Sequence, residues 1–166
     1  MKKLKLTTGE IALISNIDYK KVSKKNWYYI KRKDNKKSYI VSSAYKKNKS
    51  NRILLHHFIL EIKSSRNYCV DHKNGNIFDN RRKNLRIATY SQNNCNKNKM
   101  SHRSGKALTS KYKGVSWDKY ELKWRPVVYY KGKKYSFGYF KSERKAALAY
   151  NKMAKKIHGK FARINK

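Results

Sequence analysis

Four polar residues between Cys69 and Asn94 have the types and spacing that metal-assisted hydrolysis needs. Asp71 and His72 are adjacent, Asn84 follows His72 by twelve residues, and Asn93 follows Asn84 by nine. Carboxylate and amide oxygens are hard ligands that suit a divalent cation, and a neutral imidazole can take a proton from water. Such a set could hydrolyse a phosphodiester, with the cation stabilising charge on the phosphoryl group and on the leaving 3′-oxygen.

The local pattern indicates the elements that must position these residues. Residues 68–72 and 85–88 read as short strands, and the loop between them is rich in Asn, Gly and Arg. Thr89 and Gln92 form a capping box at the start of a helix, which places Asn93 in its first turn. Strand, loop, strand and helix could thus bring the polar side chains together.

The neighbouring positions of Asp71 and His72 pose a geometric problem. Adjacent residues of an ideal strand point to opposite faces, so both cannot reach one metal pocket. Two solutions stay open at this point: an irregular backbone, or positions on opposing sides of the scissile group.

The joint spacing of Asp71-His72, Asn84 within Asn-Leu-Arg, and Asn93 resembles the H-N-H nucleases of the β-β-α-metal fold. It matches the branch whose third motif residue is Asn. The stretches 5–30 and 53–60 also look like the N-terminal region of phage and intron-encoded H-N-H homing endonucleases. The resemblance implies a metal-dependent DNA endonuclease, a phosphodiester hydrolase.

The same resemblance implies a role for each motif residue. Asp71 and Asn93 would bind one Mg²⁺ or Mn²⁺ per active site, His72 would be the general base, and Asn84 would fix the loop that orients His72. Further residues are expected to brace that loop (Asn76 and Asn80) or to contact phosphates (Arg81, Arg82 and Arg86). His56 and His57 lie in an apolar run and are interpreted as packing or DNA-contact residues.

The charge of the chain predicts a polyanionic partner. Among 166 residues, 44 are Lys or Arg and 9 are Asp or Glu, which gives a formal net charge of +35. Double-stranded DNA is the first candidate, and no protein partner is implied. A membrane is not expected, because no stretch approaches the ~18 apolar residues of a spanning helix and the N-terminus lacks a signal-peptide core. The expected location is intracellular, in the cytoplasm or nucleoid of the host cell.

The polar, basic stretch from Asn96 to Gly114 divides the chain. We expect an α+β protein with a nuclease domain at 1–96, its β-β-α-metal motif at about 68–98, a basic linker at 97–110 and a DNA-binding domain at 111–166. The first part should hold a small sheet, with strands at 10–14, 27–31 and 37–44, against which residues 53–62 pack.

The last part predicts a three-stranded antiparallel sheet packed on one helix. Strands at 116–117, 123–130 and 133–140 precede a helix that begins after Ser142 and ends at Gly159. Trp124, Pro126 and Val128 share the apolar face of the second strand, and the opposite face is cationic. The helix stripe expected to cover the apolar face is Ala146, Ala149, Tyr150, Met153 and Ile157.

The uncovered sheet face is the predicted duplex-binding surface, since a thin sheet can enter a major groove. Residues 111–165 resemble the plant Apetala-two/ethylene-response-factor domain through SKYKGV, KWR, GKKYSFGYF and the following helix. In that family the sheet reads DNA. The residue pattern and the resemblance together give the expected contacts: Ser116, Lys119, Lys123, Arg125, Val127, Tyr129, Lys134 and Ser136.

These observations favour a homing-type DNA endonuclease, phage or intron-encoded, that works as a monomer or transient dimer. One H-N-H site per chain predicts that a monomer nicks one strand. Two alternatives stay open: a non-catalytic, sequence-specific DNA-binding regulator that retains the nuclease scaffold, and a basic RNA-binding protein.

Overall fold

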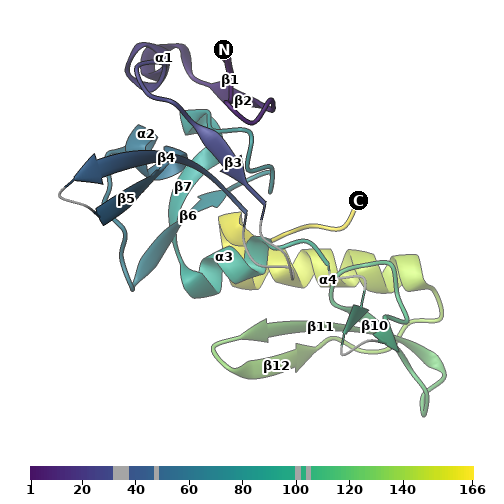
Figure 1. The fold of residues 1–166 in the computed structure, drawn as a ribbon. Helices are drawn as coiled ribbons and strands as arrows, with labels where there is room; N and C mark the ends of the chain where they lie inside the picture. Colours follow the sequence, from purple (N-terminus) through teal and green to yellow (C-terminus); the bar gives the residue numbers. More distant parts are fainter. Residues whose placement is uncertain (32–37, 47–48, 100–101, 104–105) are drawn as a thin grey trace. The chain divides into compact units, whose positions relative to one another are not determined.

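The computed structural model describes residues 1–31, 38–46, 49–99, 102–103 and 106–166 (Figure 1). The chain forms two compact units, Met1–Tyr90 and Ser91–Lys166. Both contain small antiparallel sheets and helices, so the predicted α+β class is confirmed. Among the described residues, no helix combines the length and the apolar character needed to cross a membrane.

The first unit begins with two small sheets and two short helices. Its elements before the motif are β1 (Lys2–Lys5), β2 (Ile11–Ile14), α1 (Asn16–Val22), β3 (Tyr28–Ile30), β4 (Tyr39–Lys46), β5 (Lys49–Leu54) and α2 (Leu55–Leu60). Strands β1 and β2 form a hairpin, and β3, β4 and β5 form a three-stranded antiparallel sheet. The strands predicted at 10–14 and 27–31 are present as β2 and β3. Because β2 pairs with β1 and not with β3, the prediction that these strands share one sheet is wrong. The one predicted at 37–44 starts at Tyr39, and its first residue lies outside the described ranges.

Three elements of this unit were not predicted: β1, α1 and β5. Strand β5 has the polar sequence KSNRIL, which lacks the apolar alternation of a typical strand. Helix α1 has only 7 residues, so its apolar residues show no clear helical spacing in a Lys-rich chain. Helix α1 nevertheless buries Asp18 and Val22. Tertiary packing, and not local propensity, therefore decides these elements.

One hydrophobic core joins the early elements to the motif. Trp27, Leu55 and Ile59 are almost fully buried in it, and the indole Nε1 of Trp27 donates to the Val22 carbonyl at 2.8 Å. Val70 and Leu85, from the two motif strands, are part of the same core. The motif thus shares its support with the N-terminal sheets.

The motif has the predicted order of strand, loop, strand and helix. Its elements are β6 (Tyr68–His72), the short 3₁₀ helix η1 (Arg82–Asn84), β7 (Leu85–Thr89) and α3 (Tyr90–Asn96). Strands β6 and β7 are antiparallel, with Asp71 opposite Arg86 and His72 opposite Leu85. Helix α3 starts directly after Thr89, at the predicted cap position. The unit boundary at Tyr90/Ser91 falls six residues before the predicted one and leaves most of α3 in the second unit.

The second unit contains two sheets and the longest helix. Its elements after α3 are β8 (His102–Arg103), β9 (Lys106–Ala107), β10 (Val115–Asp118), β11 (Lys123–Tyr130), β12 (Lys133–Ser136), α4 (Glu143–His158) and the 3₁₀ helix η2 (Gly159–Phe161). The β8–β9 pair lies in the predicted linker. The sheet order β10-β11-β12 and the helix that packs on it agree with the prediction.

Strand β12 ends four residues earlier than predicted. Gly138 has a φ of 78°, a left-handed conformation that interrupts the strand. Phe140 then returns to the sheet, and its backbone exchanges hydrogen bonds of 2.8 and 2.9 Å with Trp124. The predicted helix ends are correct, since the Ser142 side chain accepts from the Lys145 N–H and Gly159 follows the last helical residue.

The core of the second unit lies between β11 and α4. Ala146 and Tyr150 are buried as predicted, and Met153 and Ile157 are partly buried. Ala147 and Ala154 are also buried, so the buried stripe is wider than the predicted one. Small side chains at these positions let the helix backbone approach the sheet closely.

Substitution Gly114→Ala is expected to destabilise the second unit by about 3 kcal/mol. Gly114 has a φ of 70°, and an added Cβ would lie 2.0 Å from Tyr150 Cε2 and 2.8 Å from the Val127 carbonyl oxygen. The matched control is Gly132→Ala, because Gly132 has a similar φ of 75° but open space around it. The control should lose only about 1 kcal/mol. Denaturant unfolding measures both, and equal losses would contradict the packing argument.

Candidate active site and nucleic-acid interface

His72 ends strand β6 with its ring held on one side by an amide. Its Nε2 lies 3.3 Å from Asn80 Oδ1, and Asn80 Nδ2 donates to the Ile77 carbonyl at 2.8 Å. Burial lowers the pKa of His72 below its usual value, and the bond to Asn80 together with the charges of Asp71 and Asp79 opposes that shift. The ring is therefore kept largely neutral near pH 7.

A second imidazole that sequence reasoning did not connect with the site contacts His72. The His56 ring, on α2, is edge-on to the His72 ring, with centroids 5.5 Å apart and planes at 84°. On its other side it meets His57 at 4.8 Å and 85°. His56 is buried, so the interpretation of this residue as packing is correct, but what it packs on is the predicted base.

Asn84 forms hydrogen bonds to two separate parts of the loop between β6 and β7, one at Asn74 and one at Asp79. Its Oδ1 accepts from the Asn74 N–H at 3.0 Å, and its Nδ2 donates to Asn74 Oδ1 at 3.0 Å and to the Asp79 carbonyl at 2.7 Å. The side chain of Asn76 has a smaller part, accepting from the Phe78 N–H at 3.0 Å. Asn80 contacts His72 directly. Asn74 and Asp79 are bracing residues that the sequence did not single out.

Asp71 and His72 point to opposite faces of the β6–β7 ladder. The ladder stays regular through both residues, so side chains alternate between its faces. On the Asp71 face, Arg86 Nε and Nη2 donate to Asp71 Oδ2 at 2.7 and 2.6 Å. Of the two arrangements left open above, the regular strand matches the one with the residues on opposing sides.

Arg81 and Arg82, expected at phosphates, are also paired with buried carboxylates. Arg81 binds both oxygens of Asp79 at 2.7 and 2.6 Å, which lowers the pKa of that carboxyl. Arg82 Nε and Nη2 bind the buried Asp18, and Nη2 also donates to the Ile59 carbonyl at 2.9 Å. The side chain of Arg82 is 44% exposed, that of Arg81 25% and that of Arg86 11%. Arg82 is thus the most accessible of the three for a further anion.

Asn93 lies on α3, in the second unit. The structure describes the two units separately, so its pairing with Asp71 at one cation stays a prediction. No group of three or more His, Cys, Asp or Glu side chains that could hold a metal lies within the described ranges. One carboxylate and one amide oxygen nevertheless suit Mg²⁺, which binds few protein ligands and keeps several waters.

The predicted cationic face of the C-terminal sheet is formed by the observed register. Ser116 pairs with Arg125, Val127 with Ser136 and Tyr129 with Lys134, so these side chains share the face away from α4. Arg125 is oriented by its neighbours: Nε donates to Ser136 Oγ at 2.9 Å, and Nη1 lies 3.6 Å from Asp118 Oδ2. Lys119 is exposed in the turn after β10 and Lys123 begins β11.

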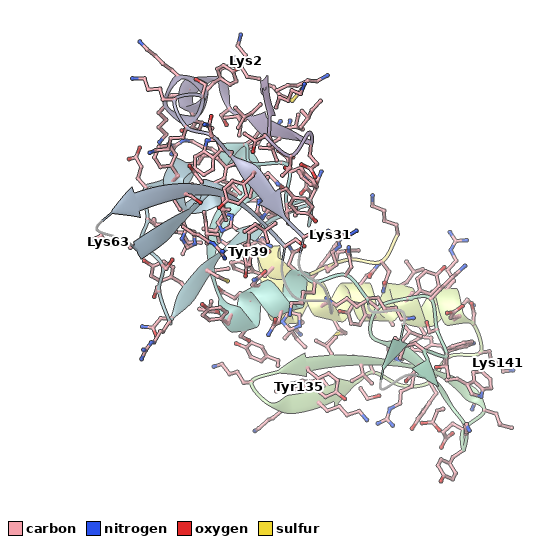
Figure 2. All side chains as sticks on the ribbon, in the orientation of Figure 1. Lys2, Lys31, Tyr39, Lys63, Tyr135 and Lys141 are labelled. Carbon is pink, nitrogen blue, oxygen red and sulfur yellow. The ribbon has the colours of Figure 1, made fainter. Side chains whose placement is uncertain are left out.

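Basic side chains are not confined to this sheet. Figure 2 shows nitrogen-tipped side chains projecting from both units, including the labelled Lys2, Lys31, Lys63 and Lys141. All four are exposed, in accord with the net charge of +35. Such a surface attracts phosphates over a wide area and needs ordered groups elsewhere to select a site.

Lys113 is an exception among the lysines because it is turned inward. Its Nζ donates to the carbonyls of Cys95 at 2.5 Å and Lys97 at 2.7 Å, at the end of α3. Burial lowers its pKa to about 8. Asn165 adds two bonds to the Lys113 backbone, at 2.7 and 3.0 Å. The sequence offered no signal for this role, since Lys113 stands in a basic run.

Comparison with known proteins gives two relatives. The chain is 31% identical over 158 residues to an uncharacterized HNH endonuclease of Acanthamoeba polyphaga mimivirus. The matched region covers 95% of this chain and 76% of the relative. It is 33% identical over 97 residues to protein 3.8 of Escherichia phage T7, covering 58% of this chain and 75% of that protein. No family model matches the chain, and no solved structure matches significantly.

The first relative bears on identity because the match extends over nearly the whole chain, both units included. It also agrees with the motif read from the sequence and with the strand, loop, strand and helix around it. The chain belongs to the HNH endonuclease family.

Proposed function

We propose that this protein is a homing-type DNA endonuclease that hydrolyses a phosphodiester with His72 as general base and one divalent metal ion. The observation that carries the proposal is the environment of His72. The ring is largely buried, kept neutral, and fixed at Nε2 by an amide oxygen at the end of a regular strand. A neutral, oriented imidazole is what proton abstraction from water requires.

The partners of Asn80 assign the reactive nitrogen of His72. Because Asn80 Nδ2 donates to the Ile77 carbonyl, its Oδ1 faces His72 and can only accept. His72 Nε2 must then carry the hydrogen, which leaves the lone pair on Nδ1. Nδ1 would therefore take the proton from the attacking water.

Asp71 and Asn93 are the residues that would hold the cation. Their donor chemistry fits Mg²⁺ or Mn²⁺, since both offer hard oxygens. A bound ion would supply charge stabilisation for the phosphoryl group and the leaving 3′-oxygen. Arg86, whose Nε donates to Asp71 Oδ2 at 2.7 Å, orients this carboxylate.

The cationic face of the C-terminal sheet would position duplex DNA. Its β10-β11-β12 order and single covering helix support the resemblance to the plant Apetala-two domain. Arg125, held by Ser136 and Asp118, is the candidate for base contact, while Lys123 and Lys134 would contact phosphates. A monomer with one such site would nick one strand, and a double-strand break would need a transient dimer.

Substitution His72→Ala should reduce cleavage by at least ~10²-fold and leave duplex binding nearly unchanged, because a general base contributes that much to the rate. Supercoiled plasmid or phage-derived DNA that carries the target is incubated with each protein in Mg²⁺ or EDTA. The expected product is open-circle or nicked DNA from the wild type in Mg²⁺ alone. If His72→Ala lost duplex binding as strongly as it lost cleavage, the assignment of His72 as general base would be refuted. Tight binding without cleavage by the wild type would favour the regulator.

Substitution Asn84→Ala should destabilise the first unit by about 2–4 kcal/mol, since three hydrogen bonds in the loop are lost. Cleavage should fall as well, because the loop carries Asn80. The matched control is Asn76→Ala in the same loop, which removes fewer bonds and should cost about 1 kcal/mol or less. Denaturant unfolding and nicking rates are measured on both proteins. If Asn76→Ala proved as damaging, Asn84 would have no special part in the loop.

Replacing both Lys123 and Lys134 by Ala should lower the slope of log K against log salt by about 2, because each phosphate contact contributes about 0.9. The control is the pair Lys152→Ala and Lys156→Ala, two exposed lysines of α4, which covers the other face of the sheet. That control should change the slope little. Fluorescence anisotropy on a labelled duplex at several salt concentrations gives the slopes, and identical values for the two double variants would refute the sheet-face assignment.

A further inference from the structure

Two contacts of different kinds bear on the orientation of the His72 ring. The hydrogen bond from Nε2 to Asn80 fixes one ring atom, at 3.3 Å. That bond restrains the position of Nε2, and by itself it does not set the plane of the ring. The second contact, the edge-on His56 ring at 5.5 Å and 84°, restrains the ring plane. The ring contact with His56 therefore contributes to the direction in which Nδ1 points.

His56 is itself well anchored. It is buried on α2, and its ring also lies edge-on to the His57 ring, with centroids 4.8 Å apart. His57 Nδ1 in turn lies 3.4 Å from Ser64 Oγ. Because His56 is buried and its ring packs on a second ring, we expect it to keep its position if the His72 ring tilts.

We propose that His56 is a positioning residue for the reaction: its ring fixes the plane of the His72 imidazole and hence the direction of the Nδ1 lone pair. This inference rests on the proposed function of His72 as general base. A base must be held within about 0.5 Å and 10–20° of its productive geometry, and misplacement by ~1 Å can cost ~10²-fold in rate. The role depends on ring shape and packing, not on a proton at His56.

The kinetic test compares three variants of α2 in the full-length protein. His56→Ala removes the ring contact with His72. It should lower the nicking kcat by roughly ten- to 100-fold, which is the cost expected for a misplaced base, and leave KM for the duplex unchanged. His56→Phe retains a ring of similar width and should stay within about threefold of the wild type. Phe58→Ala is the matched control for lost stability, since Phe58 lies on the same helix and packs on Trp27.

Phe58→Ala should lower the melting temperature as His56→Ala does, yet keep kcat within about threefold at a temperature where both are folded. Equal losses of kcat in the two variants would reduce His56 to a structural residue and overturn the proposal. A His56→Phe protein as slow as His56→Ala would overturn it too, since the ring nitrogens and not the ring shape would then matter.

A second readout does not depend on cleavage. Long-range ¹H–¹⁵N spectra of the imidazoles report the tautomer of His72 in the free protein. The wild type and His56→Phe should show one Nε2–H form, and His56→Ala should show a mixture or a broadened signal. An unchanged His72 spectrum in His56→Ala would contradict the positioning role. If the spectra behave as expected but His72→Ala still nicks DNA, the assignment of His72 as base fails and the packing of the two rings stands.

Discussion

Three buried carboxylates, each bound by an arginine from the short segment 81–86, hold the first unit together. Asp18 comes from α1, Asp79 from the loop and Asp71 from β6, and they pair with Arg82, Arg81 and Arg86. The chain has only 9 acidic residues against 44 basic ones. Removing the arginine of such a pair would leave a buried carboxylate without its counter-charge, which destabilises the fold. One segment therefore connects the first helix, the motif loop and the motif ladder.

The same segment determines the environment of the predicted base. Asn84 lies between these arginines and closes the loop onto Asn74 and Asp79, and the loop in turn presents Asn80 to His72. The ion pairs also change how the arginines meet DNA. A phosphate that approaches Arg86 must compete with a carboxylate already bound at 2.6 Å, whereas Arg82 retains accessible surface.

Local signals in the sequence predicted much of this structure. The Lys131-Gly132 turn, the Ser142 cap and the alternating residues of β11 are short-range features, and each appears as expected. What could not be predicted depends on contacts between distant segments. Nothing near His56 indicates that its ring meets His72, and nothing near the arginines indicates a carboxylate partner that is as far away as Asp18. In a chain of this charge, phosphate is the natural partner to infer for these arginines, and their contact with phosphate stays a prediction. The buried carboxylates are additional partners that the sequence did not indicate.

The inward lysine at the end of α3 has a consequence for where this chain can be divided and rejoined. Lys113 binds the carbonyls of Cys95 and Lys97, and residues 91–97 belong to the second unit. A chimera joined at the boundary of the two units would transfer Asn93 along with the β10-β11-β12 sheet. A chimera joined after residue 96 would instead separate α3 from the lysine that caps it. A chimera that retains both hydrogen bonds of Lys113 must therefore be joined before residue 95.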